Sequence, residues 1–370
     1  MELLIDGLVF GEGPRWHDGR LWLSDMHDGV VITVDGDGTR STVCEVPAKP
    51  SGLGWLPDGS LLVVSMIDRR ILRLGADGGL VEHADLSGLV AFDVNDMVVD
   101  GRGNAYAGHF GFSFHDAMAP GPAEVVLIRP DGTAEVAAKD MLFPNGSVVT
   151  PDGGTLIVAE SMGSQLSAFT IAEDGTLHDR RVWAGLDSMP DGICLDAEGT
   201  VWFADPSRSR CVRVAEGGAV LAAIDTPQPC FACMLGGDDG RRLHLVVATF
   251  ESIEQVVRRL MDRSTDTEFF ILNLRLVQGI SPSAAQSSGP SSVRPTASLA
   301  PEMSWPAEKC LPLACRTMTL TSRSAAARVK QVSIWSSIAG VWALAFSGRL
   351  RVITATRPST SYSTNSDSAI

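Results

Sequence analysis

Residues 191–205 read DGICLDAEGTVWFAD: a polar residue, a short apolar run, a turn at Glu198-Gly199, and a second apolar run. A Glu-Gly or Asp-Gly pair supplies the positive φ values that a tight hairpin requires, and the flanking Ile, Leu, Val and Trp side chains suit strands. This stretch therefore predicts two antiparallel β-strands joined by a tight turn.

The same unit occurs six times. The other copies read GEGPRWHDGRLWLSD from Gly11, SGLGWLPDGSLLVVS from Ser51, NDMVVDGRGNAYAGH from Asn95, NGSVVTPDGGTLIVAE from Asn145 and ACMLGGDDGRRLHLVVAT from Ala232. Their turn glycines recur at roughly 40 to 50 residues, the spacing of propeller blades, and most copies are followed by two further strand-like runs. The repeats predict an all-β fold, a six-bladed β-propeller over residues 1–254.

The repeats stop near residue 254, where the composition changes. Residues 255–370 are rich in Ser, Thr, Ala and Arg, and we expect a C-terminal extension of unknown fold that is poorly ordered. Within it, residues 267–277 (TEFFILNLRLV) are apolar enough to supply a strand that completes the last blade. The extension has 13 basic against 6 acidic residues, whereas residues 1–254 have 17 basic against 38 acidic.

The acidic propeller region disfavours a nucleic-acid partner, because phosphate contact requires a cationic face. No apolar run is long enough to span a membrane, and the first residues lack the pattern of a secretory signal, so we expect no membrane association and a cytoplasmic location. The seven cysteines are scattered and odd in number, which favours reduced thiols over a disulfide framework. The sequence does not indicate an oligomeric state.

One residue of each unit lies seven or eight positions before its turn glycine, immediately before the innermost strand. These residues are Glu12, Ser51, Asn95, Asn145, Asp191 and, approximately, Cys233. Such positions converge on the central channel of a propeller. A single Asn or Asp there is most simply a turn-closing residue, but four carboxylate or amide side chains in one ring favour a cation site. Oxygen donors suit calcium, with zinc, magnesium or manganese as alternatives.

The second strand of each unit ends on the same face and predicts a second polar ring. Its members are Asp25, Ser65, His109, Glu160 and Asp205. We expect Asp25 and Asp205 to support the channel through hydrogen bonds to its backbone or waters. His109 begins an insertion that runs past His115, and it is our candidate for substrate contact, although a single His is often only a surface group.

The chain resembles the senescence-marker-protein, gluconolactonase and luciferin-regenerating-enzyme family over roughly residues 3–250. The motifs that carry the resemblance are Gly11-Glu12-Gly13-Pro14-x-Trp16, Asn95-Asp96, Pro144-Asn145-Gly146 and Pro190-Asp191-Gly192. The resemblance implies a six-bladed propeller with one divalent metal ion bound by Glu12, Asn145 and Asp191, and with Asn95 close to metal and substrate. It implies lactone hydrolysis, in which the metal polarises the carbonyl and Asp191 orients or deprotonates the attacking water.

One departure from the family bears on the substrate. Some members have Arg two residues before the third-blade Asn, where this chain has Asp93, which argues against a sugar lactone and for another lactone or ester. Two other functions stay open at this point: a non-catalytic propeller that binds a metal or ligand, and an esterase, phosphotriesterase or strictosidine-synthase-like enzyme of the same architecture.

Overall fold

The computed structural model describes residues 1–113 and 121–248, and the backbone of residues 269–275. In these ranges the regular structure consists of strands and one short 3-10 turn, η1 (Pro206–Arg208). None of the described segments forms a helix long and apolar enough to cross a membrane. The predicted all-β class is confirmed. Apart from residues 269–275, the extension from residue 255 lies outside the described residues.

Five sheets each contain four consecutive antiparallel strands. The first two comprise β2 (Gly11–His17), β3 (Arg20–Asp25), β4 (Val30–Val34) and β5 (Arg40–Glu45), then β6 (Pro50–Trp55), β7 (Leu61–Ser65), β8 (Arg70–Leu74) and β9 (Leu80–Asp85). The next comprises β10 (Val94–Val99), β11 (Ala105–His109), β12 (Ala123–Ile128) and β13 (Ala134–Met141). The last two comprise β14 (Pro144–Val149), β15 (Thr155–Glu160), β16 (Gln165–Ile171) and β17 (Leu177–Gly185), then β18 (Ile193–Leu195), β19 (Val201–Asp205), β20 (Arg210–Val214) and β21 (Val220–Asp225).

The remaining sheet combines strands from both ends of the described chain. Its order is β1-β24-β23-β22, with β1 (Glu2–Leu8), β22 (Cys230–Gly236), β23 (Arg242–Val247) and β24 (Phe269–Arg275). β24 pairs antiparallel with both β23 and β1. It falls within residues 267–277, where the sequence predicts a strand, while the domain boundary at residue 254 stays a prediction.

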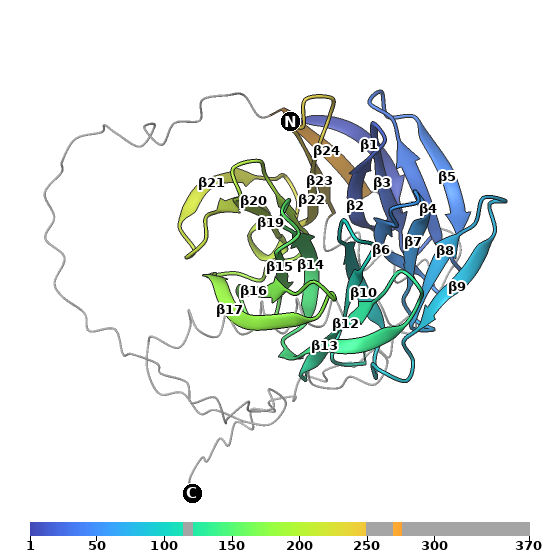
Figure 1. Cartoon of the computed structure of the whole chain (residues 1–370). Helices are drawn as coiled ribbons and strands as arrows, with labels where there is room; N and C mark the ends of the chain where they lie inside the picture. Colours follow the sequence, from blue (N-terminus) through green and yellow to red (C-terminus); the bar gives the residue numbers. More distant parts are fainter. Residues whose placement is uncertain (114–120, 249–268, 276–370) are drawn as a thin grey trace, which may run out of the picture.

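The sheets are arranged around a central axis as the blades of a propeller. In the five consecutive sheets the first strand lies towards this axis, and in the sixth sheet β22 does. The strands β5, β9, β13, β17 and β21 lie at the periphery (Figure 1). Along the axis β2, β6, β10, β14, β18 and β22 contact one another in this order, and β22 in turn contacts β2. The chain segments that carry the predicted channel residues are thus neighbours around the axis.

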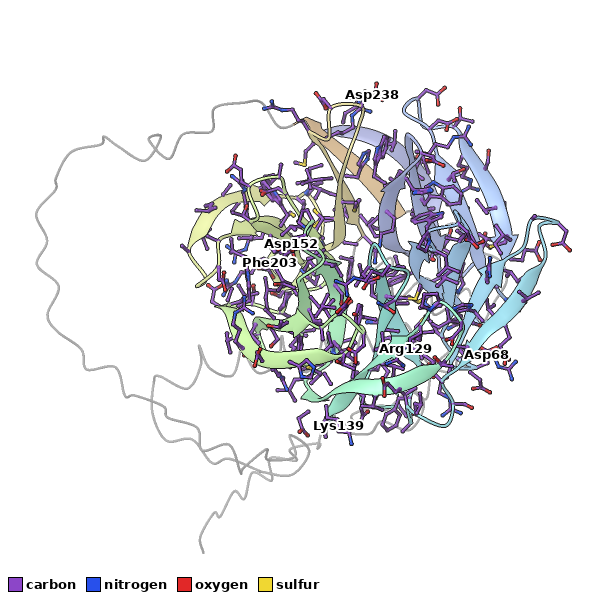
Figure 2. The ribbon with its side chains drawn as sticks, in the orientation of Figure 1. Asp68, Arg129, Lys139, Asp152, Phe203 and Asp238 are labelled. Carbon is purple, nitrogen blue, oxygen red and sulfur yellow. The ribbon has the colours of Figure 1, made fainter. Side chains whose placement is uncertain are left out.

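Apolar side chains pack between neighbouring sheets. Tyr106 and Phe169 belong to a cluster between the β10–β13 and β14–β17 sheets, and Phe203 to the next cluster. Figure 2 shows Phe203 inside the molecule and Lys139 and Asp238 at its outside, where both are exposed. Burial of aromatic and branched side chains between the sheets gives the rigid support on which the channel residues are held.

Candidate functional site

Four predicted ring residues, Glu12, Ser51, Asn95 and Asn145, occupy equivalent positions on the inner strands, and Asp191 lies two residues before β18. The residue before each ring position pairs with the last residue of the second strand: Gly11 with Asp25, Pro50 with Ser65, Val94 with His109 and Pro144 with Glu160. Cys230 pairs with Val247 in the same way, so the sixth ring position belongs to Phe231. The placement of Cys233 in the ring is wrong, because β22 has 7 residues where β6 has 6 and the count from the turn shifts.

Three carboxylates from separate sheets interact at the axis. Glu12, Asp96 and Asp191 are buried, with exposed fractions of 9%, 8% and 2%. Burial raises the pKa of Glu12 well above its usual range, and the charges of Asp191 and Asp96 raise it further, against an opposing effect of Arg15. Burial likewise raises the pKa of Asp191, which the Asn145 amide lowers and the Asp96 charge raises. A protein interior that brings buried carboxylates together favours a positive charge between them.

Asp191 is the most exceptional member of this group. Among the described side chains, its two carboxylate oxygens are buried and accept no hydrogen bond of normal geometry. Buried carboxylates of folded proteins are normally paired or hydrogen-bonded. Asp191 also lines a narrow pocket, with room for about one water molecule, together with Asn145, Ser161, Phe143 and Met189. An unsatisfied carboxylate at a pocket is the expected signature of a group that binds a cation.

Ser161 positions Asn145 and was not identified from the sequence. Its hydroxyl donates to the carbonyl of Pro190 at 2.7 Å, and the Asn145 amide donates to the same hydroxyl at 3.2 Å. Ser161 therefore connects the inner strand that carries Asn145 to the residue before Asp191. The signal for this role was its position, since Ser161 directly follows the second-ring residue Glu160.

Glycines next to the ring residues let neighbouring inner strands approach closely. A Cβ on Gly146 would lie 2.5 Å from the backbone nitrogen of Ile193 and 2.7 Å from the carbonyl oxygen of Asp191. A Cβ on Gly52 would lie 2.2 Å from the nitrogen of Met97. All three distances are impossible for a real side chain, so Gly146 sets the spacing at which Asn145 meets Asp191, and Gly52 sets the spacing between β6 and β10.

Asp96 breaks this glycine pattern. It follows ring residue Asn95, whereas glycine follows the ring residue in the units of Glu12, Ser51, Asn145 and Asp191. Its Oδ1 accepts hydrogen bonds from the Arg15 guanidinium at 2.8 Å and from the backbone of Met97 at 2.8 Å. Asp96 belongs to the Asn95-Asp96 motif, but the sequence did not predict that its charge would act on Glu12 and Asp191.

Two second-ring carboxylates hold the chain that enters an inner strand. Asp25 accepts hydrogen bonds from the backbone of Val9 at 3.0 Å and of Phe10 at 2.8 Å, just before Glu12. Glu160 accepts one from the backbone of Leu142 at 2.8 Å, three residues before Asn145. In both sheets the second ring therefore positions the backbone that leads to a ring residue, as expected for Asp25.

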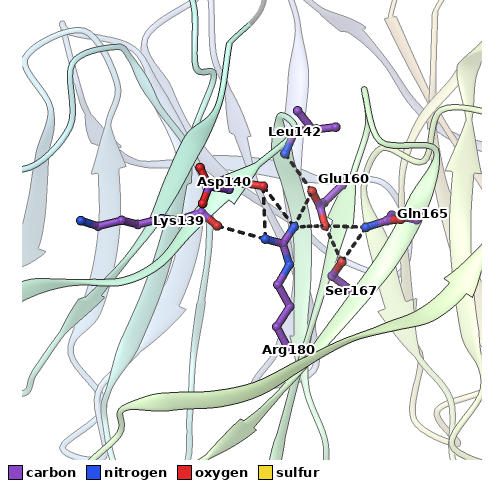
Figure 3. Close-up of polar contacts among 7 residues, drawn as sticks. All are labelled: Lys139, Asp140, Leu142, Glu160, Gln165, Ser167 and Arg180. Carbon is purple, nitrogen blue, oxygen red and sulfur yellow. Dashed lines mark hydrogen bonds and ion pairs between the residues drawn. The ribbon is translucent and has the colours of Figure 1, made fainter. Parts of the chain in front are cut away.

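Glu160 is the centre of a larger network, drawn in Figure 3. Its carboxylate also accepts hydrogen bonds from Ser167, from Gln165 at 2.9 Å and from Arg180 at 3.0 Å. Burial alone would raise the pKa of Glu160, but these hydrogen bonds and the charge of Arg180 lower it below its usual value. Glu160 is consequently a structural anion that is satisfied within the protein.

Asp205 and His109 are engaged by nearby groups. Asp205 accepts hydrogen bonds from Ser207 at 2.5 Å and from Arg210 at 2.9 Å. His109 is 1% exposed; its Nδ1 accepts from the backbone of Gly111 at 3.1 Å and its Nε2 lies 2.6 Å from the Glu124 carboxylate. Burial lowers the pKa of His109, against the effect of Glu124. The predicted substrate contact of His109 stays a prediction, and His115 lies outside the described residues.

The remaining predicted residue, Asn95, lies on β10 between these groups. It is 6% exposed, and its amide lies 3.5 Å from the carbonyl of Pro144, the residue before Asn145. Asp93, two residues earlier, holds the backbone of Phe110 through its carbonyl at 3.2 Å. Burial lowers the pKa of the partly buried Lys49, and the negative charge of Asp93 raises it, so these two charged groups interact at this end of the inner strands.

The donor set fits a divalent cation. Within the described residues no three His, Cys, Asp or Glu side chains are placed to bind one ion together. An ion here would take the carboxylates of Glu12 and Asp191 and the amide oxygen of Asn145, completed by water. The unsatisfied oxygens of Asp191 supply the structural reason, since oxygen donors of this kind suit hard cations.

Known proteins share this chain's sequence and fold. A 6-deoxy-6-sulfogluconolactonase of Pseudomonas putida is 26% identical over 248 residues, which cover 64% of this chain and 82% of the relative. A pentonolactonase of Haloferax volcanii is also 26% identical over 248 residues, or 64% and 81% of the two chains. A gluconolactonase structure from Xanthomonas campestris superimposes with a TM-score of 0.58 at 26% identity and covers 74% of this chain and 89% of its own.

The family match extends over most of the propeller. The family described as SMP-30/Gluconolactonase/LRE-like region matches residues 10–249, a range that contains every predicted ring and second-ring residue. The chain therefore belongs to the SMP-30/gluconolactonase/LRE-like family.

Proposed function

We propose that this protein is a lactone hydrolase that uses one divalent metal ion held by Glu12, Asn145 and Asp191. The observation that carries the proposal is the Asp191 carboxylate, which is 2% exposed, accepts no hydrogen bond of normal geometry among the described residues, and lies close enough to Glu12 for its charge to raise the pKa of Glu12. The lactonase relatives at 26% identity support the reaction class. The ring contact between β22 and β2 supports six blades as the architecture that holds the site.

The residues have distinct roles in this proposal. A bound cation would supply Lewis-acid polarisation of the lactone carbonyl. Asp191 orients the attacking water and accepts its proton, a role suited to a carboxylate whose pKa burial raises well above its usual range. Asn95 binds substrate hydroxyl or carbonyl groups from the neighbouring strand. His109 contributes through the chain after β11, which it holds by its hydrogen bond to Gly111.

We propose that the substrate is a lactone other than a simple sugar lactone. Asp93 takes the place of the Arg found in some relatives, and a carboxylate there repels an anionic substrate. We propose calcium as the first ion to test, with zinc, magnesium and manganese as alternatives. A cytoplasmic location and small-molecule substrates without nucleic-acid or membrane partners remain part of the proposal.

Substitution of Asp191 tests both the reaction and the cation. Asp191→Asn keeps the shape of the side chain and removes the base, so hydrolysis of a lactone panel followed in a pH-stat should fall by at least about 100-fold. Asp238→Asn is the matched control, because Asp238 is exposed on a turn remote from the axis. Unchanged hydrolysis in Asp191→Asn would reject the proposal.

A non-catalytic binding propeller is the second candidate. Apolar side chains such as Phe143 and Met189 line the narrow pocket beside Asp191, and a cation could bind to Asp191 there without any substrate being turned over. Calorimetry with calcium chloride, run beside the lactone assay, separates the two candidates. Tight cation binding without hydrolysis of any lactone, ester or phosphotriester would favour the binding protein.

A further inference from the structure

A buried ion pair joins two inner strands, β2 and β10, next to the proposed cation site. Arg15 on β2 reaches past β6, which contacts both strands, to Asp96 on β10. Its guanidinium donates to Asp96 Oδ1 at 2.8 Å and to the carbonyl of Met97 at 2.7 Å. The side chains are only 15% and 11% exposed. The pair is therefore largely shielded from solvent, and the two hydrogen bonds fix the position of the guanidinium.

The position of Asp96 would otherwise make it a ligand. It is the residue after Asn95, and its charge acts on both Glu12 and Asp191. Yet its Oδ1 is already occupied by two donors, Arg15 and the backbone of Met97. Asp96 is thus close enough to act on a cation electrostatically, but it is turned towards Arg15.

We propose that Arg15 is a fixed counter-charge that holds Asp96 away from the cation and sets the net charge of the site. This inference rests on the proposed cation site of Glu12, Asn145 and Asp191. With the Arg15–Asp96 pair neutral, the site presents the two negative charges of Glu12 and Asp191, which a divalent ion neutralises. Arg15 is a positioning residue in this scheme, because it holds Asp96 and offsets charge near Glu12 but does not itself bind the ion.

The net charge of the site in each variant determines the cation affinity that we expect. Arg15→Met keeps the apolar stem and removes the positive charge, which releases Asp96 and adds one negative charge near the ion. Asp96→Asn leaves Arg15 uncompensated and adds one positive charge. The double variant returns the site to the charge of the wild type. Each uncompensated charge is expected to change cation affinity by at least about tenfold at an interior effective dielectric constant.

The test is calcium binding to chelator-treated full-length protein, measured by calorimetry with calcium chloride and repeated with zinc chloride. Arg15→Met should bind at least about tenfold more tightly than wild type, Asp96→Asn about tenfold more weakly, and the double variant within about threefold of wild type. Arg15→Lys retains the positive charge but not the fixed geometry of the guanidinium, so its affinity should lie between those of wild type and Arg15→Met. Asp96→Asn keeps the test decisive if Arg15→Met does not fold.

A second readout separates a counter-charge from a merely structural pair. In chelator, Arg15→Met should unfold at a lower temperature than wild type, and added calcium should stabilise it by more than it stabilises wild type, since affinity and stabilisation are linked. Weaker calcium binding in Arg15→Met, or wild-type binding in Asp96→Asn, would overturn the inference while leaving the proposed function in place. A wild-type protein that binds neither ion would overturn both.

Discussion

The Glu160 carboxylate accepts a hydrogen bond from the backbone of Leu142 at 2.8 Å, and Leu142 precedes the ring residue Asn145 by three positions. Asp25 does the same for the chain before Glu12, through Val9 and Phe10. These carboxylates do not point to a ligand. They fix where an inner strand begins, so the stability of the propeller and the geometry of the site depend on the same contacts.

Replacement of Glu160 should therefore destabilise the protein. Glu160→Gln retains the shape but leaves Arg180 without its carboxylate and weakens the bonds from Leu142 and Ser167. Because Arg180 is 34% exposed, we expect a modest loss of about 1–3 kcal/mol in the free energy of unfolding at pH 7, measured by urea denaturation. Glu173→Gln is the control, since Glu173 is exposed, and should change stability by less than about 0.5 kcal/mol.

The same variant should alter the pH dependence of stability. The pKa of Glu160 is lowered in the folded state, so its contribution is complete above the unfolded pKa of about 4.3 and is lost as pH falls through the folded pKa. Between about pH 5 and pH 3 the wild type should lose more stability than Glu160→Gln. Parallel denaturation curves for the two proteins over this range would contradict this account.

The close approach of inner strands can be tested at Gly146. Gly146→Ala places a Cβ 2.5 Å from the nitrogen of Ile193, so β14 and β18 must move apart, at an expected cost of about 3 kcal/mol in unfolding free energy. Gly185→Ala is the matched control on β17, the outer strand of the same sheet, because nothing lies within 4 Å of its added Cβ. Equal thermal stability of the two variants would show that Gly146 does not set the spacing.

The five cysteines of the described residues should be unreactive in the native protein. Cys44, Cys194, Cys211, Cys230 and Cys233 are free and buried. Burial raises the pKa of the Cys44 thiol to about 11, which keeps it protonated at pH 8. For Cys233, burial raises the pKa but hydrogen bonds with Cys194 and Cys211 lower it to about 5, so this thiol is protected only by its burial. In a variant with Cys310 and Cys315 replaced by Ser, Ellman's reagent should label no thiol before denaturation and five thiols after it. Rapid labelling of the native protein would indicate that these strands open.

The sequence predicted the ring because its positions obey a local rule. Turn glycines and the strand alternation fix the register, and this places Glu12, Asn95 and Asn145 correctly on their strands. The rule failed in the last unit, where the longer β22 places the ring position at Phe231, two residues before the predicted Cys233. Periodicity is therefore informative only as long as each strand keeps its length.

The contacts around the ring were not predictable in the same way. Arg15 and Asp96 are 81 residues apart, and no pattern within one unit indicates that their side chains meet across the axis. The link from Ser161 to Pro190 likewise depends on how two sheets pack. The sequence specifies which residues face the axis, whereas the packing of whole sheets decides which of them are paired and which, like Asp191, are left unsatisfied.

The unsatisfied carboxylate of Asp191 implies a conflict between function and stability. Burial raises its pKa, and an acid whose folded pKa is raised costs the protein stability as pH rises from the unfolded pKa to the folded pKa. In chelator, Asp191→Asn should therefore be more stable than wild type, by on the order of 1 kcal/mol at pH 8 and by less at pH 5. Calcium chloride should raise the unfolding temperature of the wild type but not of Asp191→Asn, as followed by circular dichroism. Asp238→Asn, on an exposed turn, should behave as wild type in every condition. If Asp191→Asn is less stable than wild type in chelator at pH 8, the carboxylate is already satisfied by groups of the protein and does not require a cation.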